Sequence, residues 1–530
     1  MRCFFVYWEI IYIFAPSKQK KVRRKTIYPI DWVDCHPYRT ANQVDNFYAD
    51  LANKVFECIK NSGIADAFDE DKEVMKDVAI HLTMYLEDLA SEIGVWRVAT
   101  TEFRKRYGSP LPFFELGDDY EEGFVNREDV RFLLWNEVQC YRGFESFVNP
   151  ENIGIEQVAS EIFDLLDKAW ETAPSNLRLY VFMHNSAALD SYWNARELIE
   201  WFHENAFVCT NTWYDLSEAE EDCQDSQNPD IAIYAFRIED AFKHKHNMLS
   251  ISVPKWIGRI RRQEERDIWE NIKWKHISYL EYYGDDGERL YLRDLAYDEN
   301  FMVEKDSFNE NFLRKQLKMN DVLYCSLVSF KSTWNQCGQL VGLGKKNNKM
   351  QELIDEQRRN LDNLNAQHTI YPKFMELSKG KKMLFFGSTD ELKEAYKNLG
   401  FKGVDENFKI EFEKNCVLMC SPVNGLVLVF EQAACICDDD NPFYDKEFAK
   451  NNALQFYFNE NLIDYSDACD LHEGNYLPDA KITSLKGDEY GNRFLHKYGQ
   501  YIIDYYFSQT REYDYNAKFE LNRFRPMKNE

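Results

Sequence analysis

Three features are missing from this sequence of 530 residues, and each absence excludes a class of protein. No apolar run reaches the roughly 20 residues that a transmembrane helix needs, so we expect no transmembrane segment. The 13 cysteines, scattered from Cys3 to Cys469, lack the dense spacing of a secreted disulfide scaffold, which favours reduced thiols in a cytoplasm. Basic residues are in deficit, with 64 lysines and arginines against 90 aspartates and glutamates, and the net charge is −26. Such a chain repels phosphate backbones, so general nucleic-acid binding is disfavoured.

The amino terminus has an unusual order of apolar and charged residues. Residues 3–14 are almost wholly apolar and precede the basic run SKQKKVRRK, whereas a secretory signal has its positive charge first. No methionine occurs between Met1 and Met75, although globular patterning begins near Tyr28. Residues 1–27 are therefore expected to be a doubtful or disordered extension. Either the start site is assigned too far upstream, or this is a short tail that contacts a membrane surface or a partner.

Apolar periodicity predicts an α+β protein, with an N-terminal helical bundle followed by mixed α/β middle and C-terminal regions. We expect a helical domain at 28–174, a mixed α/β domain at 175–318, a C-terminal α+β domain at 319–510 and a tail at 511–530. In the middle region, runs rich in branched and aromatic residues predict buried strands at 177–185 and 231–238, on either side of a helix at 195–206.

Further along the chain, the acidic stretch at 215–230 has no apolar period and predicts a solvated loop. A strand from Asp321, a turn at 331–333 and a second strand predict a hairpin. The segment CGQLVGLGKKNNK, residues 337–349, then lies between a strand and a helix, as a phosphate-binding loop does. The pattern would need glycine and a hydroxyl residue where the chain has Gln339 and Lys346, so we interpret the segment as a turn.

Four residues are candidate zinc ligands because thiolates and imidazoles at close spacing suit a tetrahedral site: Cys435, Cys437, Cys469 and His472. The first two are expected on one face of a strand and the last two one helical turn apart. Apolar neighbours favour the alternative of inert buried cysteines. No cofactor is therefore predicted, although zinc stays open. Glu200 and His203 form half of a carboxylate-metal motif, but a second copy is missing, so we interpret them as a surface helix face.

Five residues of the segment PKWIGRIRRQEER form a candidate binding surface: Lys255, Trp256, Arg259, Arg262 and Arg266. On one helix the four cations follow steps of four, three and four residues and so lie in a stripe. The stripe suits phosphates or an acidic partner, with the tryptophan available for stacking. The acidic neighbours Glu264, Glu265 and Asp267 favour the alternative of a solvated helix face.

Four segments carry a resemblance: TIYPIDWVDCHPY, DNFYADLANKVFE, CDDDNPFYD and NYLPDAKI. With these, the chain resembles a family of uncharacterised bacterial proteins, a domain of unknown function associated with gut anaerobes. The resemblance implies an intracellular bacterial protein and carries no activity. We interpret the chain as a binding or scaffolding protein for an unknown or acidic partner, and we do not favour an enzyme. The alternative is a metal-dependent hydrolase or a structural zinc protein that uses the C-terminal cysteines, histidine and aspartates.

Overall fold

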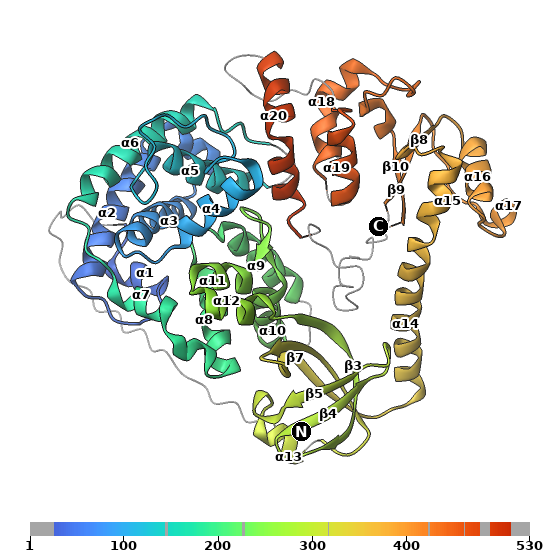
Figure 1. The fold of residues 1–530 in the computed structure, drawn as a ribbon, viewed down its shortest axis with the longest axis horizontal. Helices are drawn as coiled ribbons and strands as arrows, with labels where there is room; N and C mark the ends of the chain where they lie inside the picture. The colour runs from blue at the N-terminus through green and yellow to red at the C-terminus, as the bar shows by residue number, and fades with distance from the viewer. Residues whose placement is uncertain are drawn as a thin grey trace.

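The computed structural model describes residues 26–143, 147–224, 228–315, 317–421, 425–459, 462–477 and 488–509. Helices come first and sheets follow, so the expected α+β class is confirmed. The chain runs in a circuit from a helical part through a barrel and a long helix to a small sheet, and its last helix returns to the first helices (Figure 1). All but two residues of the expected N-terminal extension, and the expected tail, lie outside the described residues.

The helical part begins with amphipathic helices, whose apolar faces form one large core. They are α1 (Pro29–Asp34), α2 (Gln43–Lys60), α3 (Lys72–Ala90), α4 (Val95–Tyr107), α5 (Arg127–Arg142) and α6 (Ile153–Trp170), with the 3-10 helix η1 (Gly63–Phe68) after α2. Buried Asp88 of α3 caps α4, because its carboxylate accepts the backbone N–H groups of Gly94, Val95 and Trp96 at 2.8–3.0 Å. This cap fixes the angle between two consecutive helices.

The next segments correct the strand predictions, because both runs are helices. The helices here are α7 (Leu177–His184), α8 (Tyr192–Asn205), α9 (Thr210–Cys223) and α10 (Pro229–Lys243), with the 3-10 helix η2 (Ser186–Leu189) after α7. A strand at 177–185 would bury every second side chain, but Leu179 and Met183 are buried while Leu177 and Val181 are 70% and 57% exposed. Spacing by four residues has outweighed a composition typical of strands.

The run at 231–238 is helical for a similar reason. Pro229 occupies the first turn of α10, and Ala235, Ile238 and Phe242 form its buried face at steps of three and four. The helix predicted at 195–206 is confirmed as α8. The loop predicted at 215–230 is wrong up to Cys223, where α9 ends, and again from Pro229, where α10 begins.

A closed barrel of five strands follows two short strands and two short helices. These four elements are β1 (Lys245–His246), β2 (Ile251–Ser252), α11 (Val253–Ile260) and α12 (Gln263–Glu270). The barrel consists of β3 (Trp274–Asp285), β4 (Arg289–Asp294), β5 (Asn300–Glu304), β6 (Asp321–Phe330) and β7 (Thr333–Lys345), with η3 (Lys305–Ser307) and α13 (Glu310–Lys315) between β5 and β6. The predicted hairpin is confirmed, because β6 and β7 pair across residues 331 and 332.

The barrel strands are ordered β3-β4-β5-β7-β6, and β6 closes on β3. Neighbours are antiparallel except β5 and β7, which are parallel. This Greek-key order is that of the OB fold. Helix α10 is fixed to the barrel by Glu239, whose carboxylate accepts from the Ser326 hydroxyl at 2.7 Å and from the Gln339 backbone N–H at 3.1 Å. A side chain at Gly338 would collide with Glu239, so this contact requires glycine.

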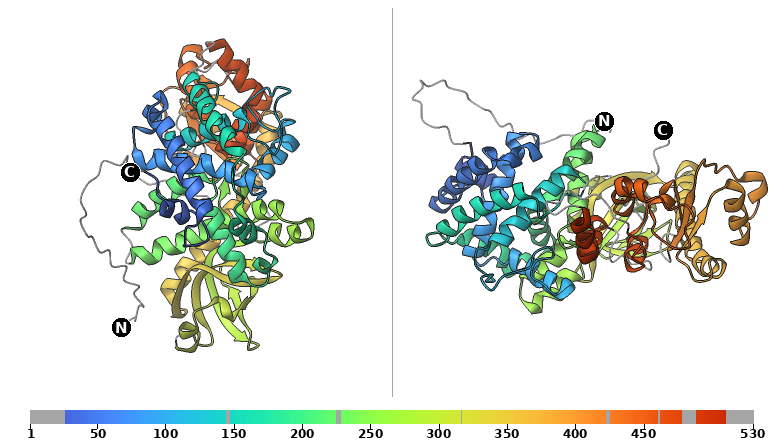
Figure 2. Two further views of the ribbon diagram at one scale, coloured as in Figure 1. Left: turned by 90° about the vertical axis from the view of Figure 1, so that its left-hand side faces the viewer. Right: turned by 90° about the horizontal axis from the view of Figure 1, so that it is seen from above.

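The C-terminal part contains a small sheet and the last helices (Figure 2). Its elements are α14 (Asn348–His368), α15 (Ile370–Leu377), β8 (Met383–Phe386), α16 (Thr389–Asn398), α17 (Val404–Asn407), β9 (Cys416–Ser421), β10 (Gly425–Phe430), η4 (Gln432–Cys435), α18 (Lys446–Tyr457), α19 (Tyr465–Glu473) and α20 (Asp488–Tyr506). The sheet is antiparallel in the order β10-β9-β8. Among the described residues, none of the helices combines the length and apolarity needed to span a membrane.

Helix α20 returns to α4 and α5 through aromatic side chains. Tyr501 is 2% exposed, and its ring centroid lies 5.0 Å from that of Phe113. Tyr505 lies against Trp135, with centroids 5.3 Å apart, and its hydroxyl donates to Asn136 Oδ1 at 2.9 Å. This contact joins the end of the chain to its beginning.

We expect Tyr501→Ala to lower the free energy of unfolding by about 3–5 kcal/mol, because a buried ring is lost from the contact between α20 and the bundle. Tyr501→Phe keeps the ring and should cost less than about 1 kcal/mol, since the hydroxyl has only a 3.5 Å contact with the Met248 carbonyl. Urea unfolding followed by circular dichroism measures both. Equal losses in the two variants would contradict a contact that depends on ring packing.

Candidate functional site

The barrel carries an apolar row on the outward side of strands β3, β4 and β5. Tyr283, Tyr291 and Met302 form this barrel row. Strand register places Tyr291 opposite Met302 on one side and opposite Gly284, the neighbour of Tyr283, on the other. The rings of Tyr283 and Tyr291 stack, with centroids 6.0 Å apart and planes at 30°. Tyr283 and Met302 are 43% and 49% exposed, so the row offers a ligand an aromatic and apolar surface.

Charged side chains border the barrel row. Arg289 Nε lies 3.5 Å from Glu304 Oε1, and Arg293 Nη2 lies 2.5 Å from Asp298 Oδ1. In the turn between β3 and β4, Asp286 Oδ1 accepts the backbone N–H groups of Glu288 and Arg289 at 3.0 and 2.7 Å. The bond from the Arg289 N–H lowers the pKa of Asp286, so this carboxylate stays charged at neutral pH.

The sequence contains one signal for this row. The segment Arg-Leu-Tyr-Leu-Arg, residues 289–293, alternates polar or aromatic side chains with leucines, which predicts a strand with one buried face. Leu290 and Leu292 are in the barrel core. The sequence does not show that Tyr283 and Met302 flank Tyr291, because that follows from strand register.

A second cluster, of buried histidines and aspartates, lies where α8, α9 and α10 meet β1. Its members are Asp215, Asp240, His203, His244 and His246, and the three imidazole centroids are 5.1–5.8 Å apart. His203 and His246 are fully buried, and Asp240 is 4% exposed. Buried ionisable groups are costly unless they are paired, so the contacts among them decide whether the cluster stabilises the fold.

The contacts of this histidine cluster form a series. The Thr212 hydroxyl lies 3.3 Å from His246 Nδ1, and His246 Nε2 lies 3.3 Å from His203 Nδ1. His203 Nε2 is 3.2 Å from Asp240 Oδ2, which is 3.5 Å from His244 Nδ1. The series thus extends from α9 through β1 and α8 to α10.

The far end of the series reaches the end of the described chain. His244 Nε2 lies 2.7 Å from Asn211 Nδ2, 3.2 Å from Gln509 Nε2 and 3.6 Å from the half-exposed Asp215 carboxylate. Gln509 also donates to the Lys245 carbonyl at 2.7 Å. The cluster therefore fixes the segment after α20 to β1.

Burial and charge act in opposite directions within the cluster. Burial disfavours a charged His244, but Asp240 and Asp215 outweigh it and raise the pKa of His244. Burial likewise disfavours the Asp240 carboxylate, yet His244 and His203 hold its pKa well below the usual value. Burial and repulsion by His244 and His203 lower the pKa of His246. The carboxylates therefore favour the protonated form of His244, and burial with its histidine neighbours favours the neutral form of His246.

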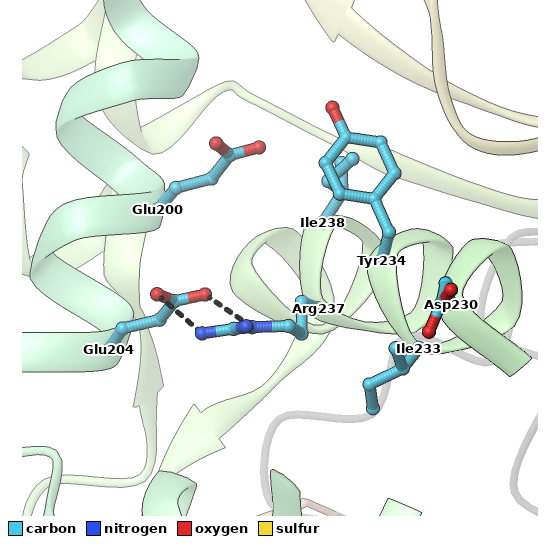
Figure 3. Close-up of a pocket in the computed structure, with 7 residues that line it drawn as sticks. All are labelled: Glu200, Glu204, Asp230, Ile233, Tyr234, Arg237 and Ile238. Atoms are coloured by element: carbon cyan, nitrogen blue, oxygen red, sulfur yellow. Dashed lines mark hydrogen bonds and ion pairs between the residues drawn. The ribbon is translucent and has the colours of Figure 1, made fainter. Parts of the chain in front are cut away.

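A pocket of about 350 Å³ lies between α8 and α10 (Figure 3). Glu204 receives two hydrogen bonds from Arg237 across it, each 3.0 Å long. Glu200 also faces the pocket and lies 2.5 Å from Arg196 Nε. These two glutamates are neutralised by arginines. The earlier interpretation of a surface helix face is wrong for His203, which belongs to the buried cluster three residues after Glu200.

The candidate zinc ligands are not arranged as the sequence predicted. Strand β10 ends at Phe430, and Cys435 lies buried in η4 while Cys437 is exposed, so the two do not share a strand face. Burial raises the pKa of the Cys435 thiol to about 12 and that of Cys469 to about 11, which disfavours the thiolate that a metal needs.

Cys469 and His472 do lie one turn apart on α19, as expected. The His472 ring packs closely on Gly499 of α20, where an added Cβ would lie 2.5 Å from its Cε1. Within the part of the chain that the structure describes, no group of three histidine, cysteine or acidic side chains is arranged to hold a metal ion. Zinc binding stays a prediction.

The basic residues do not lie on one helix, because α11 ends at Ile260 and α12 begins at Gln263. The break lets Trp269 fold back onto α11, where Gly258 leaves room for it. Trp256 is fully buried and so is not available for stacking on a ligand.

The four cations of the predicted stripe lie in different surroundings. Arg259 Nη1 lies 2.9 Å from Glu102, and Arg266 Nε lies 2.7 Å from Glu270. Arg262 is exposed and Lys255 is half-buried. A contact between these residues and an acidic partner stays a prediction.

The loop at 337–349 lies in β7 and the start of α14. Lys345 Nζ is 3.7 Å from Asp321 Oδ1 on the neighbouring strand. Gly344 has a φ of 69°, which suits the turn between strand and helix. The lysine therefore serves an ion pair within the barrel.

We expect Asp240→Asn to lower the free energy of unfolding by about 3–5 kcal/mol, because it leaves charged His244 buried without its anion. Because the pKa of His244 is raised by folding, protonated His244 contributes its full stabilisation at pH values below the ordinary pKa of 6.5. That stabilisation is lost as the pH rises through the higher pKa of the folded state. Because the pKa of Asp240 is lowered by folding, its carboxylate stabilises the fold at pH values above the ordinary pKa of 3.8. That stabilisation is lost as the pH falls through the lower pKa of the folded state. The loss of stability caused by Asp240→Asn should therefore be largest between pH 3.8 and pH 6.5, the two ordinary pKa values.

Urea unfolding of the wild type and Asp240→Asn from pH 5 to pH 9 measures this dependence. Asp230→Asn, at an exposed position of the same helix, is the matched control and should change stability by less than about 0.5 kcal/mol. A cost of Asp240→Asn that grows steadily toward pH 9 would show that the carboxylate does not stabilise a charged His244.

Comparison with known proteins gives a family but no activity. The family described as "Protein of unknown function (DUF3843)" matches residues 26–334 and 329–508. No curated protein and no solved structure matches the chain significantly. The two matched ranges cover most of the sequence, and the resemblance to an uncharacterised family is confirmed. The chain therefore belongs to this family of proteins of unknown function.

Proposed function

We propose that this protein is a binding protein whose ligand contacts the barrel row. The observation that carries the proposal is the barrel row, in which Tyr283 and Met302 are exposed and Tyr291 is half-buried, on a closed barrel of OB strand order. In that fold the ligand face is formed by the second and third strands, which here are β4 and β5. The row lies across both of these strands and continues onto β3.

The chemistry of the barrel row supports binding. Two stacked phenol rings and a thioether offer apolar contact and stacking, which hold a ligand without transferring a proton. The flanking arginines, Arg289 and Arg293, are in ion pairs with carboxylates, and these pairs orient them beside the row.

The setting that we propose is the cytoplasm of a bacterium. All twelve cysteines of the described residues are free thiols, as is common in a reducing compartment. A scaffolding role is part of the same proposal, because the barrel lies at one end of the molecule, beyond the helical part (Figure 1).

The double variant Tyr283→Ala/Tyr291→Ala tests the proposal. A panel of labelled peptides, oligosaccharides and single-stranded oligonucleotides is screened with the wild-type protein, and affinities are measured by fluorescence anisotropy. We expect at least one class to bind and the double variant to bind it at least 30-fold more weakly, because central aromatic contacts each contribute roughly 2 kcal/mol or more.

The control is Tyr180→Ala/Val181→Ala, which removes two exposed apolar side chains from α7, outside the barrel. It should keep full affinity. Binding that survives the double variant, or that is lost equally in the control, would place the ligand elsewhere and refute the proposal.

A further inference from the structure

We infer that the barrel row receives an extended segment of another protein that carries lysine or arginine. The inference rests on the proposed function and specifies its ligand. It follows from two features of the barrel: the charge around the row and the spacing of the strands that carry it.

The charge around the barrel row is negative. At least six carboxylates lie on β3 to β5 or in the adjoining turns: Glu281, Asp285, Asp286, Glu288, Asp298 and Glu304. Three cations lie among them: Arg289, Arg293 and Lys305. The carboxylates outnumber the cations by two to one, so the row lies in a field that attracts positive charge and repels phosphate.

The three cations are already engaged. They pair with Glu304, Asp298 and Asp285 at distances of 3.5, 2.5 and 2.5 Å. Because each pair cancels its own charge, the negative excess comes from Glu281, Asp286 and Glu288. Glu281 lies beside Arg293 in the strand register, at one side of the row, and the other two lie in the turn at the opposite side. A cationic side chain can therefore reach a carboxylate on either side of the row.

The row has dimensions that suit an extended segment. Neighbouring strands lie about 4.8 Å apart, so a row across three strands extends about 10 Å. A polyproline II segment advances about 3.1 Å per residue, so three residues match the row. Stacked Tyr283 and Tyr291 provide the aromatic surface on which such segments dock, and a lysine or arginine over a tyrosine ring adds a cation–π contact.

The barrel also limits the mode of binding. The sheet closes through one register pair, Val303 with Trp334, between β5 and β7, and the outward faces of β3 to β5 lie away from that seam. A segment on the row therefore contacts side chains rather than extending the sheet as a further strand. A neutral oligosaccharide could stack on the tyrosines but would bring no cation to the three excess carboxylates. A single-stranded oligonucleotide would stack equally well but would meet the negative field.

Three proline-rich peptides of equal length provide the test, with lysines, glutamines or glutamates at the same positions. Their affinities for the full-length protein are measured by fluorescence anisotropy at low and moderate salt, beside a neutral oligosaccharide and single-stranded oligothymidylate. We expect the lysine peptide to bind about tenfold more tightly than the glutamine peptide and to weaken as salt screens the carboxylates. The glutamate peptide and the oligonucleotide should not bind.

Matched variants separate the charge from the stacking surface. Glu281→Gln/Glu288→Gln should remove most of the preference for lysine over glutamine, whereas Glu171→Gln/Glu220→Gln, at exposed positions of the helical part, should keep it. Tyr283→Ala/Tyr291→Ala should abolish binding of the lysine peptide. All variants are first compared with the wild type by thermal unfolding.

The outcomes distinguish the ligand class from the binding site. Equal binding of the lysine and glutamine peptides overturns the inference. Preferred binding of the oligosaccharide or the oligonucleotide, lost in the tyrosine variant, also overturns the inference but supports the proposed function. Binding of any probe that survives the tyrosine variant, or no binding by any probe, overturns both.

Discussion

The packing of α20 against α4 and α5 is the contact on which the arrangement of the chain depends. The last described helix is separated by hundreds of residues from the bundle that it joins, and its tyrosines enter the same core as Phe113 and Trp135. Bringing such distant parts of a chain together costs conformational entropy. The burial and packing of several aromatic rings offsets that cost. Without that contact the small C-terminal sheet would be held to the rest chiefly through α14. With it, the chain closes into a circuit, and Gln509 reaches the histidine cluster.

The histidine cluster adds specificity to this closure. Apolar packing alone tolerates small shifts of one helix along another, but the contacts of His244 with Asp240, Asn211 and Gln509 depend on the relative position of the elements that carry them. The buried Asp240 carboxylate favours a protonated His244 in the interior, and it is itself held ionised by His244 and His203. The contacts between the buried histidines and Asp240 thus fix how α8, α9, α10 and β1 pack together. The barrel is fixed to the same region through Glu239 of α10, so the barrel row is held on a rigid support.

Sequence reasoning succeeded where one short-range pattern determined an element, and it failed where two patterns competed. The hairpin of β6 and β7 was predictable because two apolar runs flank a short polar turn at Lys331 and Ser332. The segments at 177–185 and 231–238 have a composition typical of strands. Their helical spacing becomes clear only from the positions that are buried in the structure. The histidine cluster was missed because His203 and the H-x-H pair of His244 and His246 are 41 or more residues apart in sequence. Only the packing of α8 on α10 and β1 brings them together.

The barrel row could not be predicted from the sequence alone. Each of its members is an ordinary exposed residue within its own strand, and the row arises from the register that aligns three strands. Net charge predicts repulsion of polyanions but gives no place for a ligand, because the value of −26 belongs to the whole chain. Local ion pairs decide where that charge is free to act. Arg289, Arg293 and Lys305 each form an ion pair with a neighbouring carboxylate. The carboxylates that are left without a cation lie beside the aromatic rings. A surface that combines stacking with uncompensated carboxylates selects a ligand that brings its own positive charge.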